Sequence, residues 1–266
     1  GAVKIKIGDP RVGVSGDMLR VEAARKAIGD DVVLMADANC ALNLEQSLVF
    51  AEELEKFNVY WFEEPMPIHR YKEHGILRNR SGVKIATGEN GYHLAHFETL
   101  LDHSGADILN VDVTICPGYD VAKDVTDLAL KRGISIAPHG CQELQLPLAA
   151  AIPHGEFLEY YPVAVDPLRA EMFLPRMVPD DDGYVTVPDR PGIGPVADHR
   201  GRPGSAGPRR PHRIAASDRQ PSRHLLPRRN PPGRHQTTCG SHRRAGGKPG
   251  QRAPALRPGP ELPQSV

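Results

Sequence analysis

Short apolar runs recur through residues 1–161 at the interval of one β/α unit, and this rhythm constrains the fold more than any other feature of the chain. Each run is rich in Val and Ile, and a longer amphipathic stretch separates it from the next. That alternation predicts β/α units around a parallel sheet. The candidate strands are residues 2–8, 31–37, 59–64, 83–89, 107–112, 134–139 and 156–161, and the candidate helices include 18–28, 44–57, 93–102, 118–131 and 143–151.

Periodicity alone fits an open doubly wound sheet as well as a barrel, so the polar residues have to decide between them. Polar side chains stand at, or just beyond, the C-terminal end of each candidate strand, where a β/α barrel gathers its active site. We therefore expect an α/β fold of the (β/α) TIM-barrel type, with seven candidate strands where a closed barrel has about eight. The residues expected to meet are Lys4, Lys6, Asp37, Asn39, Glu63, Glu89, Asp112, His139 and Glu159.

Three carboxylates follow one another at the length of one β/α unit. Asp37, Glu63 and Glu89 lie 26 residues apart, so three adjacent strands would each deliver one carboxylate to the same place. Hard oxygen ligands with no Cys or His among them suit Mg²⁺. Each residue taken alone could be an ordinary carboxylate of the barrel rim, but the shared spacing favours a metal site.

Two further features indicate acid–base chemistry. Lys4 and Lys6 share one side of a strand, and like charges held close together should lower the pKa of each ammonium group, so that a lysine can act as a base. A solvated strand end is the simpler interpretation of this pair. His139 ends a strand one β/α unit after Asp112, which could orient the imidazole and stabilise its protonated form. Without Asp112, a structural hydrogen-bonding role for the histidine would be favoured.

The chain changes character after Tyr161. Residues 162–194 are rich in turns and predict a C-terminal segment that folds back, which gives a first domain of residues 1–194. Residues 195–266 contain 13 Pro and 14 Arg and no Phe, Tyr or Trp, so we expect them to form a disordered tail. Residues 1–194 hold 18 Lys and Arg against 30 Asp and Glu, whereas the tail holds 15 against 3.

Cysteine usage and hydropathy point to a reduced, soluble protein. Cys40, Cys116, Cys141 and Cys239 show neither zinc-site spacing nor the density of a disulfide scaffold. The sequence contains no apolar run of about 18 residues and no signal-peptide pattern. We expect a cytoplasmic location and no membrane partner.

Taken in order, these motifs resemble the mandelate racemase subgroup of the enolase superfamily. The resemblance covers about residues 2–194, and each motif alone is unspecific whereas the ordered set is not. The motifs are KIK at Lys4, DAN at Asp37, EEP at Glu63, GEN at Glu89, VD at Asp112, PHG at His139 and LEY at Leu158.

The resemblance implies a role for each of these residues. Asp37, Glu63 and Glu89 would ligate Mg²⁺, Lys6 would be one general base, and His139 paired with Asp112 would be the other. Glu159 would hydrogen-bond the oxygen of the enolate, which requires it to carry or share a proton. Lys4 would assist near the substrate carboxylate, and Asn39 would contact the substrate.

Such a site would remove the α-proton of a small carboxylate, because the metal and a hydrogen-bond donor stabilise the charge that develops. Two bases on opposite faces of the α-carbon permit either racemisation or loss of a β-hydroxyl. By analogy with the family we favour dehydration of an acid sugar, with a racemase or epimerase of an α-hydroxy acid as the alternative.

The chain also departs from the family's pattern. Members carry a capping domain and a first barrel strand before the KxK strand, and this chain begins almost at that strand, so we expect both to be missing. Intact members are expected to be homo-oligomers. The tail suggests a shift of reading frame after about Gly194. A non-catalytic barrel with a basic arm that binds nucleic acid is the alternative of another class, and we regard it as the less favoured.

Overall fold

The structure is a computed structural model that describes residues 1–189 and 191–197. Within these residues it contains a six-stranded parallel sheet in the order β1-β2-β3-β4-β5-β6. The strands shorten along the chain: β1 (Ala2–Lys6), β2 (Val33–Asp37) and β3 (Val59–Glu63) have five residues, β4 (Lys84–Thr87) has four, and β5 (Ile108–Leu109) and β6 (Ser135–Ile136) have two. This arrangement confirms the predicted α/β class.

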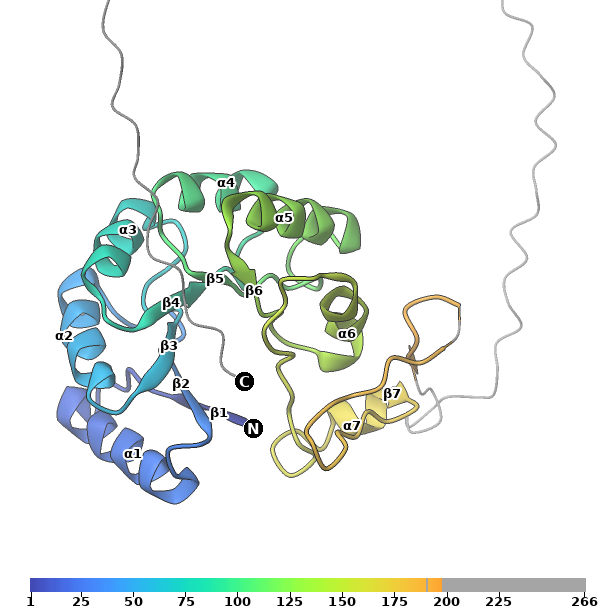
Figure 1. The fold of residues 1–266 in the computed structure, drawn as a ribbon, viewed down its shortest axis with the longest axis horizontal. Coiled ribbons are helices and arrows are strands. Elements are labelled where there is room, and N and C mark those ends of the chain that lie inside the picture. The colour runs from blue at the N-terminus through green and yellow to red at the C-terminus, as the bar shows by residue number, and fades with distance from the viewer. Residues whose placement is uncertain (190, 198–266) are drawn as a thin grey trace, which may run out of the picture. The chain divides into compact units, whose positions relative to one another are not determined.

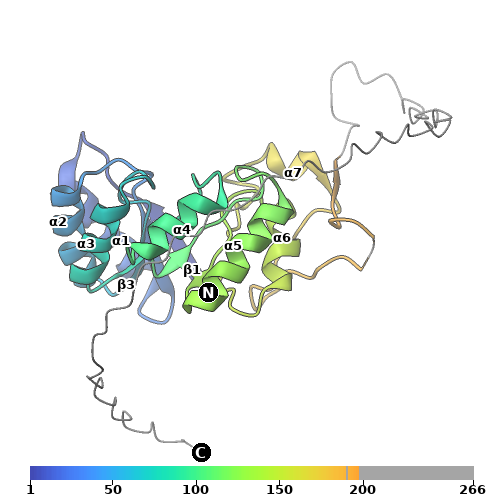
Figure 2. The same cartoon turned by 90° about the horizontal axis from the view of Figure 1, so that it is seen from above.

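Helices alternate with the strands and lie on the outside of the curved sheet (Figure 1). Seen from above, they follow one another from α1–α3 at one side to α5 and α6 at the other (Figure 2). They are α1 (Gly13–Ile28), α2 (Leu44–Glu55), α3 (Tyr71–Arg80), α4 (Leu94–Asp102), α5 (Tyr119–Arg132) and α6 (Gln142–Ala151), followed by the short α7 (Arg169–Met172). None of the described helices is both long and apolar enough to cross a membrane.

Local sequence signals explain where helix α2 begins and where helix α5 ends. Helix α2 starts at a capping box, in which the Asn43 side chain accepts a hydrogen bond from the backbone NH of Gln46 and the Gln46 side chain accepts one from the backbone NH of Asn43. The inner face of α2 buries Leu54 completely, and burial of such a side chain contributes about 1.5–3 kcal/mol. Helix α5 ends at Gly133, which adopts the left-handed conformation expected of a helix C-cap.

Apolar side chains lie on both faces of the sheet. One group, which includes Met35, Trp61, Ala86, Ile108 and Ala137, packs on the inner face, away from the helices, where Phe157 covers it. Two larger clusters fill the space between the strands and the helices. Because both faces are covered, the strands are held rigidly and their C-terminal ends have fixed positions.

The structure differs from the sequence prediction in three places: at α3, over residues 156–161 and at the end of the return segment. Helix α3 is missing from the predicted helices. Residues 156–161, predicted as a strand, form no regular strand: only an isolated parallel bridge joins Gly155 to Ile136. Beyond it the Tyr161 backbone NH donates to the side chain of Gln142 instead of to a neighbouring strand.

The return segment contains one small sheet, in which β7 (Phe173–Leu174) pairs antiparallel with β8 (Val196–Ala197). Regular structure therefore extends past the domain boundary predicted at Gly194. The predicted disorder of residues 198–266 lies outside the described residues.

Candidate metal and acid–base site

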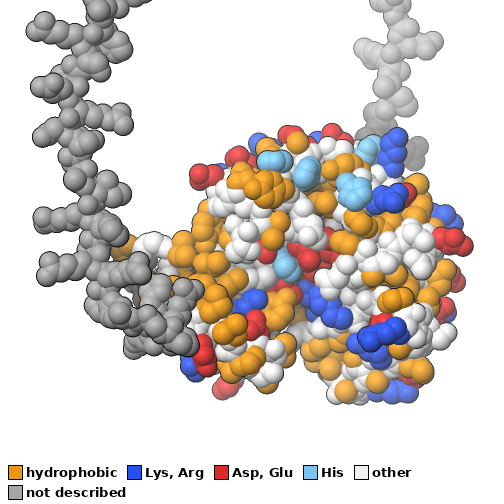
Figure 3. All heavy atoms as spheres, turned by 180° about the vertical axis from the view of Figure 1, so that it is seen from behind, with side chains coloured by type: hydrophobic (Ala, Val, Ile, Leu, Met, Phe, Trp, Pro, Cys, Tyr) orange, Lys and Arg blue, Asp and Glu red, His pale blue; other side chains and the backbone are white. Residues whose placement is uncertain are grey.

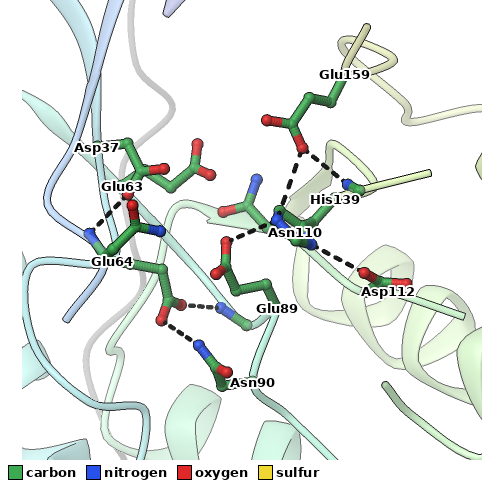
Figure 4. Close-up of polar contacts among 12 residues, drawn as sticks. Asp37, Glu63, Glu64, Glu89, Asn90, Asn110, Asp112, His139 and Glu159 are labelled. Carbon is green, nitrogen blue, oxygen red and sulfur yellow. Dashed lines mark hydrogen bonds and ion pairs between the residues drawn. The ribbon is translucent and has the colours of Figure 1, made fainter. Parts of the chain in front are cut away.

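The parallel register brings the predicted site residues to one edge of the sheet. Lys6 pairs with Asp37 on the neighbouring strand, and Asp37 pairs in turn with Glu63. Glu89, Asp112 and His139 follow the ends of β4, β5 and β6 by two or three residues. Figure 4 shows their side chains converging from several elements, and Figure 3 shows acidic, basic and histidine side chains gathered in a hollow of the surface.

Asp37, Glu63 and Glu89 form a carboxylate trio. Each offers one oxygen, and the three oxygens lie within 4.8 Å of one another. Burial raises the pKa of Glu63 and, to about 7, that of Glu89, because each carboxylate leaves water close to other negative charges. Three buried acids at such short range are costly unless a cation neutralises them.

The trio fits a hard divalent cation. All of its donor atoms are carboxylate oxygens, the ligand type that Mg²⁺ prefers. Oδ1 of the nearby Asn110 is buried and has no hydrogen-bond partner among the described residues, and Oε2 of Glu89 is buried and makes no hydrogen bond there, although Nε2 of His139 lies 3.3 Å from it. Such orphaned acceptors call for a cation or an ordered water.

The two lysines lie against this trio. The Lys4 ammonium contacts Glu63, lies 2.8 Å from Oε1 of Glu159 and reaches Asp37 at 3.9 Å. Lys6, whose side chain is 54% exposed, contacts Asp37. The expectation of a lowered pKa is wrong for Lys4: burial would lower it, but the carboxylates of Glu63, Glu159 and Asp37 outweigh burial and raise the pKa. Its nearest charged neighbours are carboxylates, and the sequence pattern did not specify how close they come to the ammonium group.

His139 lies between the trio and Asp112. Its Nδ1 is 2.9 Å from Oδ2 of Asp112, and its Nε2 is 3.3 Å from Oε2 of Glu89. Burial would lower the pKa of His139, but the hydrogen bond with Asp112 and the charges of Glu89 and Glu159 raise it. Nδ1 therefore carries the proton shared with Asp112, and Nε2 faces the hollow as the atom that can exchange a proton.

A glycine makes room for this pair. Gly140 follows His139 directly and has a φ of +93°, in the region that favours glycine. A Cβ atom at this position would stand only 2.6 Å from Oδ2 of Asp112. The close approach of the backbone to the carboxylate thus depends on the missing side chain.

Glu159 comes from the irregular segment after β6. It accepts hydrogen bonds from the backbone of Gly140 at 2.8 Å and from the Tyr161 hydroxyl at 2.9 Å. Burial would raise the pKa of Glu159, but Lys4 and the Gly140 hydrogen bond lower it. In this arrangement Glu159 is ionised, whereas its expected role as a hydrogen-bond donor requires a proton.

Asn39 lies at the rim of the site. It follows Asp37 in an exposed turn, and its backbone NH donates to Oδ1 of Asp37 at 2.8 Å. Its side chain lines a hollow of about 580 Å³ together with Glu89 and Asn90. The predicted substrate-binding residue is therefore next to the trio.

Several residues that support the site were missed by the sequence reasoning. The Trp61 indole donates to Oε2 of Glu63 at 2.8 Å. Gln145, on α6, and Thr114 both donate to Oδ1 of Asp112 at 2.7 Å. Period two on β3 would have placed Trp61 on the same side as Glu63, but no sequence signal marks Gln145.

Comparison with known proteins identifies the family of this chain. The model of the family described as "Enolase C-terminal domain-like" matches residues 1–200. The L-talarate/galactarate dehydratase of Salmonella typhimurium is 32% identical over 194 residues, which cover 73% of this chain and 47% of that protein.

Two solved structures are similar over the same part of the chain. The L-talarate dehydratase from a Polaromonas species, in complex with Mg and L-glucarate, superimposes with a TM-score of 0.68 at 33% identity and covers 75% of this chain and 54% of that one. A racemase from Streptomyces coelicolor with bound magnesium gives a TM-score of 0.68 at 31% identity, with coverage of 74% and 52%. The chain thus spans about half the length of these relatives.

A parallel β/α-barrel domain that presents three carboxylates and a histidine–aspartate pair at its strand ends defines a class of barrel proteins with a candidate metal and acid–base centre. The chain belongs to the enolase C-terminal domain-like family, and its structural neighbours confirm the predicted enolase-superfamily barrel.

Proposed function

We propose that the intact protein is a magnesium-dependent enzyme that removes the α-proton of a small carboxylate, and that it dehydrates an acid sugar. The observation that carries this proposal is the carboxylate trio with a candidate base on each side of it. Lys6 contacts Asp37 at one side, and His139 approaches Glu89 at the other. The relatives named above, a talarate/galactarate dehydratase and a talarate dehydratase, support the acid-sugar class.

Asp37, Glu63 and Glu89 would hold the ion, since they alone supply three oxygen donors at one point within residues 1–189 and 191–197. When bound, Mg²⁺ supplies Lewis-acid stabilisation of the negative charge that develops on the substrate carboxylate.

His139 is the better defined of the two bases. Asp112 fixes the imidazole through Nδ1, so Nε2 is left to take or give a proton in the hollow. Asp112 is itself held by Thr114 and Gln145, which prevents the pair from rotating. Lys6 would serve as the second base once its ammonium group moves away from Asp37 and loses its proton.

Lys4 is the hydrogen-bond donor that this arrangement supports best. Its raised pKa keeps it protonated, and it lies between the trio and Glu159. It can therefore donate to the oxygen on which negative charge develops. Glu159 positions Lys4 as an ionised partner and takes a donor role only if it gains a proton.

Two bases on opposite sides allow two outcomes after the α-proton is lost. His139 in its protonated form can assist departure of a β-hydroxyl, which gives dehydration. Return of a proton from the other side gives racemisation or epimerisation, and the similarity to a racemase keeps this as the second candidate.

The experiment uses the intact protein with Mg²⁺ and a panel of aldonic and aldaric acids, assayed for the 2-keto product. Turnover that is abolished by chelation and by Glu89→Gln supports the proposal. Exchange of the α-hydrogen with deuterium from solvent, without loss of water, would assign the racemase reaction instead. No exchange and no dehydration across the panel would sink both.

The remaining predictions from the sequence stay proposals. They are a first domain over residues 1–194, a separate tail over 195–266, a cytoplasmic location and homo-oligomers of the intact protein. A nucleic-acid-binding role of the tail is the competing proposal, tested by salt-dependent binding that is lost when residues 195–266 are removed.

A further inference from the structure

A fourth buried carboxylate, that of Glu64, lies beside the trio (Figure 4). Glu64 follows the expected ligand Glu63, is fully buried and has a φ of +41°. A glutamate rarely adopts this left-handed conformation, which is strained and persists only where the surroundings impose it. Nothing in the proposed mechanism uses this residue.

Donors from the ends of β2 and β4, the two strands that flank β3, surround the Glu64 side chain. From the turn after β2, the Cys40 thiol donates to Oε2 at 2.7 Å. From β4 and the turn after it, Thr87 Oγ1 and the Gly88 backbone donate to Oε1 at 2.5 and 2.8 Å, and Asn90 Nδ2 donates to Oε2 at 3.0 Å. Figure 4 shows Glu64 and Asn90 beside Glu63 and Glu89.

The backbone of Glu64 reinforces these contacts. Its NH donates to the carbonyl of Ala86 on β4 at 2.9 Å, and its carbonyl accepts from the NH of Cys40 at 2.7 Å. Glu64 thus binds the segments that carry all three members of the trio: the turn after Asp37, its own neighbour Glu63, and the stretch that leads to Glu89.

The charge of Glu64 lacks a partner of opposite sign. Among the ion pairs of the described residues, none includes Glu64, whereas Asp37 and Glu63 both contact lysines. Four neutral donors offset part of the cost of burying a carboxylate, but a nearby cation would offset more.

We propose that Glu64 is a positioning residue for the metal centre: it fixes the spacing of Asp37, Glu63 and Glu89, and the bound divalent ion balances its charge. The inference rests on the proposed magnesium site. Outer residues that orient metal ligands typically account for about 10–100-fold in metal affinity, so Glu64→Gln should weaken binding by that factor. Glutamine keeps the shape of the glutamate side chain, but its NH₂ group would face hydrogen-bond donors at a place where a carboxylate oxygen accepts from them.

The test measures Mn²⁺ binding to the full chain by electron paramagnetic resonance, together with the melting temperature in the absence of metal. Two variants keep the charge of Glu64 and test its hydrogen bonds. Thr87→Val removes one donor to Glu64, whereas Thr87→Ser keeps a hydroxyl at this position. The matched control is Asp107→Asn. Asp107 is likewise a carboxylate that joins separate segments, because it accepts hydrogen bonds from the Ile85 backbone and from Arg78, but it lies at the opposite end of the sheet.

The proposal expects weaker Mn²⁺ binding in Glu64→Gln, a smaller loss in Thr87→Val and recovery in Thr87→Ser. Asp107→Asn should lower the melting temperature and leave the affinity within about twofold of wild type. Unchanged affinity in both Glu64→Gln and Thr87→Val would overturn the positioning role while leaving the magnesium site intact. If Glu64→Gln does not fold, the two Thr87 variants decide. A wild-type chain that binds no Mn²⁺ overturns the metal site and the inference together.

Discussion

The two halves of the site are built differently. The carboxylate half, formed by Lys4, Lys6, Asp37, Glu63 and Glu89, comes from β1–β4, whose strands have four or five residues. The imidazole half, formed by Asp112, His139 and Glu159, follows the two-residue strands β5 and β6 and an irregular segment. Strand register fixes the first half, whereas side-chain hydrogen bonds from Thr114, Gln145 and Tyr161 fix the second.

This difference teaches that a metal centre and an acid–base pair can tolerate different kinds of support. Ligands at short range need a rigid frame, because small displacements separate their oxygens. A histidine needs mainly one fixed ring nitrogen, which a single hydrogen-bonded carboxylate provides. The two halves should therefore respond differently to substitution.

The largest effect should come from the carboxylate half. Glu89→Gln removes a charged ligand, so we expect Mg²⁺ binding to disappear and turnover to fall by about 1,000-fold or more. Calorimetric titration of Mg²⁺ and steady-state rates on the acid sugar found by screening would measure both. Glu98→Gln, an exposed position on α4, is the control. Retained binding in Glu89→Gln would remove this residue from the ligand set.

The imidazole half should lose activity without losing metal. Asp112→Asn leaves His139 without its charged partner, and we expect turnover to fall by about 100- to 1,000-fold while Mg²⁺ affinity stays within about twofold. The same titration and rate measurements apply. Equal losses of Mg²⁺ affinity and turnover rate would show that the metal ligands and the imidazole pair depend on each other for their positions.

Trp61 offers a way to observe the carboxylate half directly, because it is the chain's single tryptophan and donates to Glu63. We expect Mg²⁺ to change its fluorescence in the wild-type protein and not in Glu89→Gln. Trp61→Phe keeps an aromatic ring against Phe157 but removes the donor, so metal affinity should fall by about tenfold. A Trp61→Phe variant with wild-type affinity would show that the indole only fills space.

The smallest effect concerns stability at acidic pH and involves a buried histidine on the side of the carboxylate half. His74, on α3 behind the carboxylate half, is fully buried, and burial lowers its pKa below the ordinary value of 6.5. Its contribution to stability is complete above pH 6.5 and is lost as the pH falls, because the unfolded chain then binds a proton that the folded chain excludes.

Melting temperatures measured between pH 7.5 and pH 5 should therefore fall less steeply in His74→Gln than in wild type. The glutamine amide can still donate to the carbonyl of Met66, as the imidazole does at 3.1 Å. A steeper fall in the variant would contradict the assignment.

The sequence was sufficient for the carboxylate half and less so for the other. Parallel strands with one carboxylate each, 26 residues apart, have to bring Asp37, Glu63 and Glu89 to one edge, so their proximity followed from the period. The family and the barrel class, predicted from the ordered motifs, were confirmed by the family model and the structural neighbours.

Other features depend on contacts that no period encodes. The segment 156–161 has the composition of a strand, yet Phe157 packs edge-to-face against Trp61 and the Tyr161 backbone NH donates a hydrogen bond to the Gln142 side chain, and these contacts replace strand pairing. The raised pKa of Lys4 depends on how closely its ammonium group approaches Glu63, Glu159 and Asp37, and the predicted convergence of these residues does not specify those distances. Gln145 and Glu64 likewise acquire their partners through tertiary packing.

The space that Gly140 leaves beside Asp112 has a use when related sequences are compared. Any larger residue there would have to displace the carboxylate and, with it, the imidazole that depends on it. A relative that keeps His and Asp at the corresponding positions but replaces this glycine should therefore be assumed to have given up the dyad's chemistry, even though its motif letters still match.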